Sequence, residues 1–366
     1  MQRCSYTKPN NTAMEEGKSD LHKERFLPFL KFLKGKEAYL ALSGGGLALV
    51  CHIAVIRLIE TFGIEIKKVY GTSAGAVIGG LYAAGLSSVQ MEEAVLKLKS
   101  PDDLFGRRSR HFLYRALKSE FQASVMNRGF MSAGIYTSTS LEKYFEDVIR
   151  RNVGRVPQLG ELKIPFTAVS LNIGSGKAPD IGLSLKEDFS SETSPSVSLK
   201  DAMVASLSIP GIFPPKKIKG YYYIDGGVVE HLPIVSAYED WLHSKRLGRN
   251  KAVVIAVNLG YGGARLTKSV AIKPHDMVIY ATSIQGKIID QYNLLRVHKP
   301  NKGFSVILLK PRCYDIGLTD FDKIPKAIVK SFDTTLNQLQ GDRFLHETEE
   351  DVAKARLMLG LGEKSR

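Results

Sequence analysis

Short apolar runs alternate with longer apolar stretches near the start of the chain. Residues 38–42 form a short apolar run that predicts a buried strand, and residues 47–62 stay apolar over about four turns, which predicts a buried helix. Residues 68–70 and residues 74–84 repeat this pattern as a second strand and a second helix, with Gly85 as a suitable helix end. Strand, helix, strand and helix in this order predict an α/β fold with a mainly parallel central sheet flanked by helices.

The rest of the chain carries weaker patterns of the same kinds. Residues 86–150 predict mainly helix, and residues 321–339 predict a helix with its apolar side chains on one face. Residues 186–198 are rich in serine and contain Asp, Glu and Pro, so they predict a mobile surface loop. Further strands are expected at residues 162–172, 221–224, 252–259 and 305–309.

A candidate nucleophile lies between the second strand and the second helix. Residues 71–75, with the sequence GTSAG, fit the pattern G-x-S-x-G between a strand and a helix, which is the context of a nucleophile elbow. The elbow is a tight turn, so Gly71 and Gly75 supply the small residues that must flank it. The unpaired N–H groups at the helix start would stabilise negative charge beside Ser73. The alternative is that Ser73 only caps the helix.

A run of three glycines follows the first strand. Gly44, Gly45 and Gly46 allow backbone N–H groups to face a ligand without side-chain obstruction. A phosphate loop is disfavoured because no Gly-Lys-Ser/Thr follows, and a dinucleotide fingerprint would need glycine where Leu49 stands. A structural tight turn stays open as an alternative. An oxyanion hole is favoured, because the serine elbow follows one strand–helix unit later.

A serine nucleophile needs a proton acceptor, and no histidine of the chain has a distinctive context. His52 lies inside an apolar helix and is typical of a satisfied core histidine. Asp225 ends a short predicted strand and is followed by Gly226 and Gly227, which predicts a carboxylate held in a sharp turn. From the residues alone, Asp225 is either the base or a turn former, because Asp-Gly is a common turn dipeptide.

Composition narrows the choice of partners only a little. The 366 residues carry a formal net charge of +14 and a hydrophobic fraction of 44%, which suits a folded globular chain. The positive charge has two interpretations: an ordinary solvated protein surface, or an anionic membrane surface as partner. Zinc-finger and RNA-recognition motifs are missing from the sequence, which argues against nucleic acid. The candidate residues require no metal and no cofactor, and the oligomeric state stays open.

Targeting signals and cysteines bear on location. Residues 1–20 lack the apolar stretch of a signal peptide, and no run of about 18 apolar residues predicts a spanning helix. The three widely spaced cysteines, Cys4, Cys51 and Cys313, suit neither a disulfide framework nor a metal site, so Cys51 is expected to be a buried thiol. These features predict a cytoplasmic protein in a reducing compartment, with peripheral attachment to a membrane as an alternative.

Taken together, the motifs resemble those of the patatin-like phospholipase family, particularly its bacterial members, over roughly residues 38–260. The resemblance implies a patatin-like three-layer fold and hydrolysis of fatty acyl esters, typically of phospholipids, lysophospholipids or neutral lipids. It implies a dyad without histidine, in which Ser73 is the nucleophile and Asp225 is the general base that later activates water. The matching blocks are the glycine loop Gly44-Gly45-Gly46 as oxyanion hole, the elbow with Gly71 and Gly75, the Asp225-Gly226-Gly227 turn, residues 205–215 and Leu232-Pro233.

The sequence departs from the family pattern at three positions. Ala48 and Leu49 stand where the family usually has a basic residue and then glycine, and His231 stands where asparagine is common. The oxyanion donors are backbone groups, so the missing basic side chain need not remove them, whereas Leu49 could change the φ and ψ angles of the loop. One lost donor costs about 2.7–4 kcal/mol of transition-state stabilisation, which keeps a weakly active lipid- or membrane-binding module as one alternative.

A second alternative is an α/β hydrolase esterase with a Ser-His-Asp triad, for which His243, His275 and His298 are the candidate histidines. The basic, aromatic stretch at residues 107–118 would either contact anionic headgroups or form a solvated helix face. The expected organisation has three parts: residues 1–36 as a flexible arm and short amphipathic segment, residues 37–260 as the patatin-like catalytic domain, and residues 261–366 as an α/β extension that packs on the core and ends in a polar tail.

Overall fold

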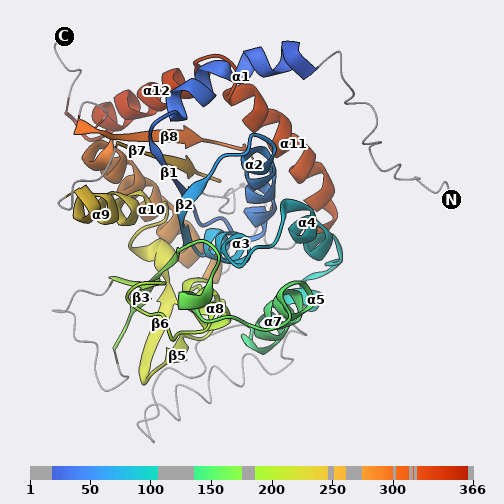
Figure 1. Ribbon diagram of the computed structural model, residues 1–366. Helices are drawn as coiled ribbons and strands as arrows, with labels where there is room; N and C mark the ends of the chain where they lie inside the picture. The colour runs from blue at the N-terminus through green and yellow to red at the C-terminus, as the bar shows by residue number, and fades with distance from the viewer. Residues whose placement is uncertain are drawn as a thin grey trace, which may run out of the picture.

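The computed structural model describes residues 19–105, 136–174, 186–245, 251–260, 274–299, 302–312, 316 and 320–361. Residues 1–18, which are most of the expected flexible arm at residues 1–20, lie outside these ranges, as do the basic, aromatic stretch at residues 107–118 and the last residues of the polar tail. Within them, a central sheet lies between two layers of helices (Figure 1).

In the part of the chain that the structure describes, the central sheet has eight strands and is parallel through most of its width. The strand order is β5 (Lys216–Ile218), β6 (Tyr221–Asp225), β3 (Phe166–Asn172), β2 (Ile66–Thr72), β1 (Glu37–Leu42), β7 (Ala252–Val257) and β8 (Phe304–Leu309), and β4 (Lys186–Ser190) pairs with β3 off this path. The run β3-β2-β1-β7-β8 is parallel, whereas β4, β5 and β6 pair antiparallel. The expected α/β fold with a mainly parallel sheet flanked by helices is confirmed.

Helices cover both faces of the sheet. On one face lie α2 (Val50–Thr61), α3 (Ala74–Ala83) and α11 (Ile324–Gln338), and on the other lie α9 (Ile234–Lys245) and α10 (Pro274–Val297) (Figure 1). No helix within the described ranges is both long and apolar enough to cross a membrane. The other helices are α1 (Ser19–Leu33), α4 (Ser88–Leu96), α5 (Pro101–Phe105), α7 (Thr139–Val153), α8 (Leu199–Ser206) and α12 (Arg343–Met358), with short 3-10 turns η2 (Gly46–Leu49), η3 (Leu159–Glu161), η4 (Gly226–Val228) and η6 (Phe321–Lys323).

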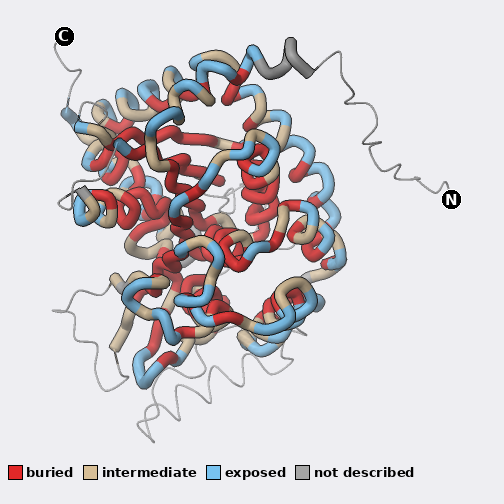
Figure 2. The backbone as a smooth tube through the Cα atoms, viewed as in Figure 1, coloured by how far each residue is buried: buried red, intermediate tan, exposed pale blue. Residues whose placement is uncertain are grey.

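Strand β1 illustrates why the central strands are mainly apolar. Leu40 and Leu42 are fully buried in the larger apolar cluster, whereas Tyr39 and Ala41 belong to the second cluster, which includes residues of α9 and α10. Successive strand side chains point to opposite faces, so a strand covered on both faces needs apolar residues throughout. The buried residues accordingly concentrate in the central strands and in α2 and α3 (Figure 2).

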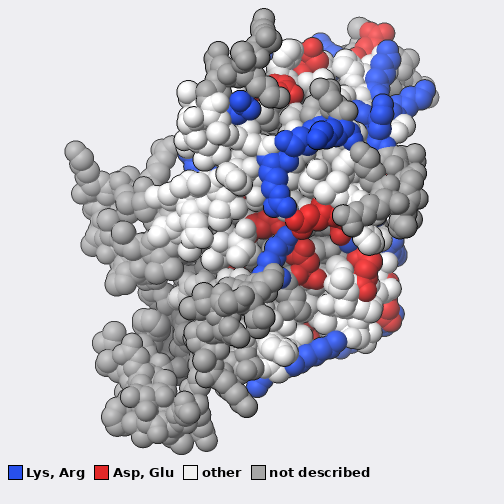
Figure 3. Space-filling model, turned by 90° about the vertical axis from the view of Figure 1, so that its left-hand side faces the viewer, with Lys and Arg blue, Asp and Glu red and all other residues white. Residues whose placement is uncertain are grey.

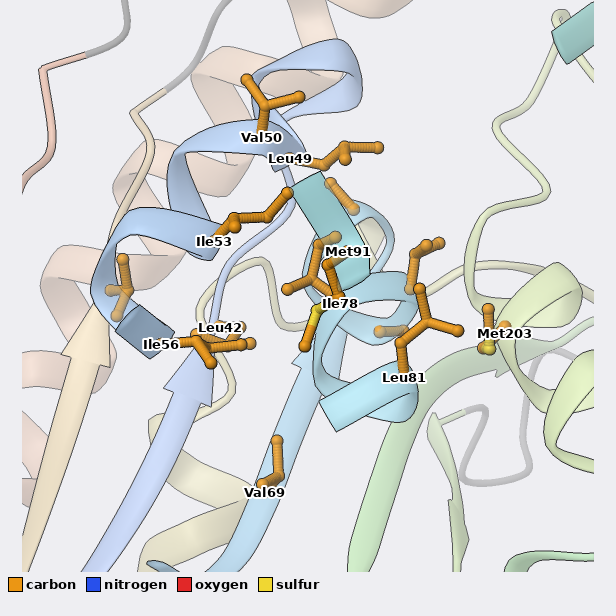
Figure 4. Packing of buried hydrophobic residues seen from close by; sticks show 14 of the residues in the cluster. Leu42, Leu49, Val50, Ile53, Ile56, Val69, Ile78, Leu81, Met91 and Met203 are labelled. Carbon is orange, nitrogen blue, oxygen red and sulfur yellow. The ribbon is translucent and has the colours of Figure 1, made fainter. Parts of the chain in front are cut away.

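The larger cluster fixes α2 and α3 to the sheet. Ile53 and Ile56 of α2 gather with Ile78 and Leu81 of α3 around the ends of β1 and β2 (Figure 4). All four side chains are at most 4% exposed. The segments on either side of these two helices, which include the glycine loop and the serine turn, are therefore held by close-packed neighbours.

The prediction of a mobile loop at residues 186–198 is wrong, because the first part of this segment forms strand β4. Phe189 is 2% exposed and packs on Tyr223, with ring centroids 4.8 Å apart. Lys186 Nζ lies 2.6 Å from Oε2 of Glu230, which is itself 2% exposed. The polar composition concealed this strand, because Phe189 is its one large apolar side chain. The contacts that hold the strand, to Tyr223 and Glu230, are made with segments far away in the sequence.

The expectation of a free thiol at Cys51 is also wrong. The residue is fully buried in α2, as expected, but it is disulfide-bonded. The other two cysteines of the chain, Cys4 and Cys313, lie outside the described residues. A disulfide removes the support that the cysteines gave to a reducing compartment. Sequence spacing could not predict the pairing, because it depends on which segments fold side by side.

Candidate active site

Ser73 lies at the turn between β2 and α3, as the sequence predicts. Its backbone angles, φ 52° and ψ −118°, fall in a region that non-glycine residues rarely adopt. Its backbone N–H donates to Ser206 Oγ at 2.8 Å, and the Ser206 hydroxyl donates to Val169 O at 2.6 Å. Although Ser73 holds the N-cap position of α3, its side chain makes no capping hydrogen bond. The hydroxyl is therefore available for another partner.

Two glycines allow the turn to approach its neighbours closely. A Cβ on Gly75 would lie 2.0 Å from Leu42 O, and a Cβ on Gly71 would lie 2.5 Å from Ala76 Cα. In both cases the obstructing atom belongs to the backbone, which cannot rotate away as a side chain can. Any larger residue at either position would force the elbow open.

Strand register explains how Asp225 comes close to this turn. Thr72, the last residue of β2, pairs with Val169 of β3, and Asp225 pairs with Ser170, the next residue of β3. Because β6 runs antiparallel to β3, its last residue ends level with the turn that follows β2. The two candidate residues thus approach each other across β3, although they are far apart in the sequence.

The Asp225 carboxylate both forms a turn and contacts the candidate nucleophile. Oδ1 accepts a hydrogen bond from Gly227 N at 2.6 Å. Burial raises the pKa of Asp225 to about 6, although the neighbouring Ser73 side chain, the Gly227 N–H and the nearby His231 act in the opposite direction. A carboxylate with this pKa is a better proton acceptor near neutral pH than an ordinary aspartate.

The glycine loop after β1 is held by two neighbours. Gly44 N–H donates to His231 O at 3.1 Å, and a Cβ on Gly45 would lie 2.7 Å from Leu259 Cδ1. The N–H groups of Gly45 and Gly46 find no acceptor among the residues that the structure describes. The loop therefore presents two donors whose hydrogen bonds are not used within the described part of the fold.

The two departures from the family pattern after the glycine loop leave its backbone unstrained. Ala48 is 2% exposed and Leu49 is 9% exposed, so both side chains pack into the core. Leu49 adopts φ −43° and ψ −32°, angles that any L residue adopts in a helix. The loop therefore does not require the additional backbone angles that a glycine at this position would allow.

The candidate residues border one cavity. Ser73, Asp225, Gly227 and the three loop glycines all line it. The cavity lining does not include Gly71, Gly75 or Gly226. These glycines instead allow neighbouring backbone segments to approach closely: a Cβ on Gly226 would lie 2.2 Å from Val169 O. The remaining lining residues, several of which sequence analysis did not single out, are Leu47, Ile209, Pro210, Val228, His231, Gly260, Thr282, Ser283 and Ile316.

Most of the histidines in the described ranges lie away from the cavity. His52 is fully buried with Nε2 2.9 Å from Ser43 O, and burial lowers its pKa to about 4, as expected for a core histidine. His243 lies on the exposed side of α9, and His298 pairs with Glu349 at 3.0 Å outside the cavity lining. The side chain of His275 lies outside the description.

His231 is the one described histidine that borders the cavity. Its Nδ1 lies 3.1 Å from Oδ2 of Asp290, a buried residue of α10. Sequence analysis missed Asp290 because no motif marks it and its partner is far away in the chain. In the described ranges, no cluster of three or more His, Cys, Asp or Glu side chains could hold a metal ion.

A sequence profile described as patatin-like phospholipase matches residues 40–238, which is more than half of the chain. The matched region contains the glycine loop, the elbow around Ser73 and the turn at Asp225. The chain belongs to the patatin-like phospholipase family, and the resemblance seen in its motifs is confirmed.

Individual relatives share less than a third of their aligned residues with this chain. An uncharacterized NTE family protein of Mycobacterium tuberculosis is 29% identical over 220 residues, covering 60% of this chain and 48% of the relative. Lysophospholipase NTE1 of Meyerozyma guilliermondii is 26% identical over 342 residues, covering 87% of this chain and 21% of that protein. The chain thus spans about half the length of the first relative and about a fifth of the second. Among solved structures, VipD from Legionella pneumophila matches with a TM-score of 0.40 and 14% identity, over 89% of this chain and 75% of that one.

Proposed function

We propose that this protein is a serine acyl hydrolase that cleaves fatty acyl esters, with Ser73 as nucleophile and Asp225 as base. The observation that carries the proposal is that Ser73, at a strained turn and without a capping hydrogen bond, lines the same cavity as Asp225 and lowers the pKa of its carboxylate. This placement allows the hydroxyl proton to pass to Asp225 as Oγ attacks a carbonyl carbon. A covalent acyl-enzyme follows, and water then releases the fatty acid.

The glycine loop supplies the oxyanion hole in this proposal. As Oγ attacks, the carbonyl oxygen gains negative charge and needs hydrogen-bond donors. Gly45 and Gly46 line the same cavity as Ser73, and the start of α3 adds the favourable end of a helix dipole. Each well-placed donor contributes about 2.7–4 kcal/mol of transition-state stabilisation.

Phospholipids and lysophospholipids are the proposed substrates, with neutral lipid esters in the same chemical class. Membership of the patatin-like phospholipase family and the relative named as a lysophospholipase support this choice. The Ser-His-Asp alternative has weaker support, since neither His243 nor His298 lines the cavity. The alternative of an inactive lipid-binding module is separated from hydrolysis by the labelling experiment below.

A fluorophosphonate probe should react with Ser73 and with no other serine of the folded protein. Mass spectrometry of the digested protein locates the adduct, and heat-denatured protein serves as the control because unfolding removes the contact to Asp225. In parallel, fatty acid release from lysophosphatidylcholine, phosphatidylcholine and triacylglycerol ranks the substrate classes. Liposome binding with neither labelling nor fatty acid release would favour the lipid-binding module instead.

Ester hydrolysis should decline as the pH falls through about 6. Asp225 must be ionised to accept a proton, and burial raises its pKa to about 6, so acidification removes the active form. Below that value kcat/KM should fall by about tenfold per pH unit. The measurement is kcat/KM for a soluble short-chain ester across this range, with circular dichroism to show that the fold persists. A flat profile down to about pH 4.5 would contradict Asp225 as the base.

We also propose that a lipid surface contacts α10 beside the cavity. Ile284, Ile288 and Tyr292 are 45%, 49% and 62% exposed, and their spacing of four residues places them on one side of the helix. Thr282 and Ser283, which directly precede Ile284 in the same helix, line the cavity. On the face drawn in Figure 3, basic side chains form a continuous band beside a group of acidic ones. The exposed apolar side chains of α10 support the proposed docking.

Changing Ile284 and Ile288 together to serine should weaken binding to vesicles and lower hydrolysis of vesicle lipids by about tenfold, because two apolar anchors are lost. Hydrolysis of a soluble short-chain ester should stay close to the wild-type rate. Val329→Ser is the matched control, since Val329 is 56% exposed on α11, away from the cavity lining. Unchanged vesicle hydrolysis in the double variant would exclude α10 as the docking surface, and an equal loss on both substrates would indicate damage to the cavity.

A further inference from the structure

We infer that His231, held by Asp290, is a second proton-transfer residue of the cavity, which protonates the departing alcohol and later takes a proton from the attacking water. This inference rests on the proposed function of Ser73 and Asp225. In a dyad alone, Asp225 would carry out every proton transfer. Here the transfers are divided between Asp225 and His231.

The His231 ring lies beside the nucleophile. A Cβ added to Gly44 would lie 3.1 Å from His231 Nε2 and 3.5 Å from Ser73 Cβ. One carbon atom would thus touch both side chains, so the Nε2 edge of the ring and the nucleophile flank the same narrow gap. His231 also borders the cavity and is only 9% exposed, so its ring is part of the cavity wall.

Asp290 fixes the orientation of the ring and determines which nitrogen faces the reaction. Its Oδ1 accepts a hydrogen bond from Leu232 N at 3.0 Å, and its Oδ2 lies 3.4 Å from Asn258 Nδ2 and 3.1 Å from His231 Nδ1. Because the first two partners are donors, the carboxylate is best satisfied when ionised and when Nδ1 donates as well. Nε2 is then the nitrogen that gains or loses a proton on the cavity side, as in other carboxylate–imidazole pairs.

Two carboxylates and one further histidine surround His231 in the described part of the chain. Among the described residues, the titratable groups that face it include Asp290 from α10, Asp225 at the end of β6 and His52 from α2. Positive charge on His231 lowers the pKa of Asp225, against the effect of burial, and so favours the ionised base. His52, whose pKa is lowered to about 4, stays neutral and adds no competing charge near pH 7. The carboxylate of Glu230 is directed instead to Lys186 and Ser236.

The proton transfers balance over one turnover. In the first stage Ser73 Oγ bonds to the carbonyl carbon while its proton passes to Asp225; the bond from that carbon to the alcohol oxygen then breaks, and the alcohol oxygen takes the proton from His231 Nε2. In the second stage water attacks the acyl carbon and gives a proton to His231 Nε2. The bond from carbon to Oγ then breaks, and Asp225 returns the proton to Ser73. Ester and water become acid and alcohol, and both groups regain their starting charge.

The test compares two butyrate esters that form the same acyl-enzyme, 4-nitrophenyl butyrate and an alkyl butyrate. Nitrophenolate leaves without a proton, whereas an alkoxide needs one. His231→Asn should lower kcat/KM for the alkyl ester by about 10²–10⁴-fold, and for the nitrophenyl ester far less. Deacylation slows for both esters, so nitrophenolate should appear in a burst followed by a slower steady state, and the acyl-enzyme should accumulate in the mass spectrum.

Two further variants make the result decisive. Asp290→Asn should shift the ratio of the two kcat/KM values in the same direction by a smaller factor, which keeps the test available should His231→Asn not fold. His298→Asn is the matched control, since His298 also pairs with a carboxylate but lies outside the cavity lining, and it should change neither ester. Equal losses on both esters without a burst, in folded His231→Asn or Asp290→Asn, would overturn the inference and leave the dyad intact. Turnover that survives in Ser73→Ala would instead overturn the proposed function itself.

Discussion

Ser73→Ala is expected to abolish ester hydrolysis and fluorophosphonate labelling while the protein stays folded. Removing the attacking oxygen leaves only substrate binding and oxyanion stabilisation, so kcat should fall by about 10⁴–10⁶-fold. The fold should persist because the turn is held through the backbone: Ser73 N–H donates to Ser206 Oγ, and Ser73 O accepts from Ala76 N. Thermal unfolding followed by circular dichroism, together with fatty acid release, measures both effects.

The matched control is Ser208→Ala. Ser208 is 1% exposed, and its hydroxyl donates to Val204 O at 2.8 Å, four residues earlier in the chain. Its contact with the site is a backbone one, from Asp225 N to Ser208 O, which the substitution keeps. This variant should hydrolyse esters near the wild-type rate. If Ser73→Ala retained as much activity as Ser208→Ala, Ser73 would not be the nucleophile.

The position of Ser73 could be predicted from sequence because its determinants are local. A strand, a tight turn and a helix follow one another within residues 66–83, and the glycines at the turn are explained by contacts with the adjacent helix and strand. The central strands could be predicted equally well, since strands buried on both faces are mainly apolar. Helices α9 and α10 lacked such a signal, because helices with mixed polar and apolar positions show weak periodicity.

The role of Asp225 could be predicted only in part from the residues next to it in the sequence. The local sequence indicated either a turn former or a base, and in the structure Oδ1 forms the turn while the carboxylate also lies beside the Ser73 side chain. The second contact depends on the register of β6 against β3, which residues near Asp225 do not encode. His231 and Asp290 are a stronger example, since 59 residues separate them and only the packing of α10 brings them together.

Gly75→Ala is expected to prevent folding or to destabilise the protein by more than about 3 kcal/mol. The added Cβ would lie 2.0 Å from Leu42 O and 2.4 Å from Leu42 C. Leu42 ends β1, which is hydrogen-bonded to β2 on one side and β7 on the other, so it cannot move without disturbing the sheet. Helix propensity alone would favour alanine by about 1 kcal/mol, so the sign of the measured change separates the clash from propensity.

Gly80→Ala makes the same substitution in the same helix and serves as the control. Its Cβ would meet Leu199 Cδ1 at 2.9 Å and Met203 Sδ at 3.2 Å, which are the ends of side chains that can rotate. Its free energy of unfolding, measured by urea denaturation, should therefore change by no more than about 1–2 kcal/mol. If Gly75→Ala were as stable as Gly80→Ala, α3 would not press against β1 at this distance, and the strained backbone of Ser73 would lose the contact that holds it.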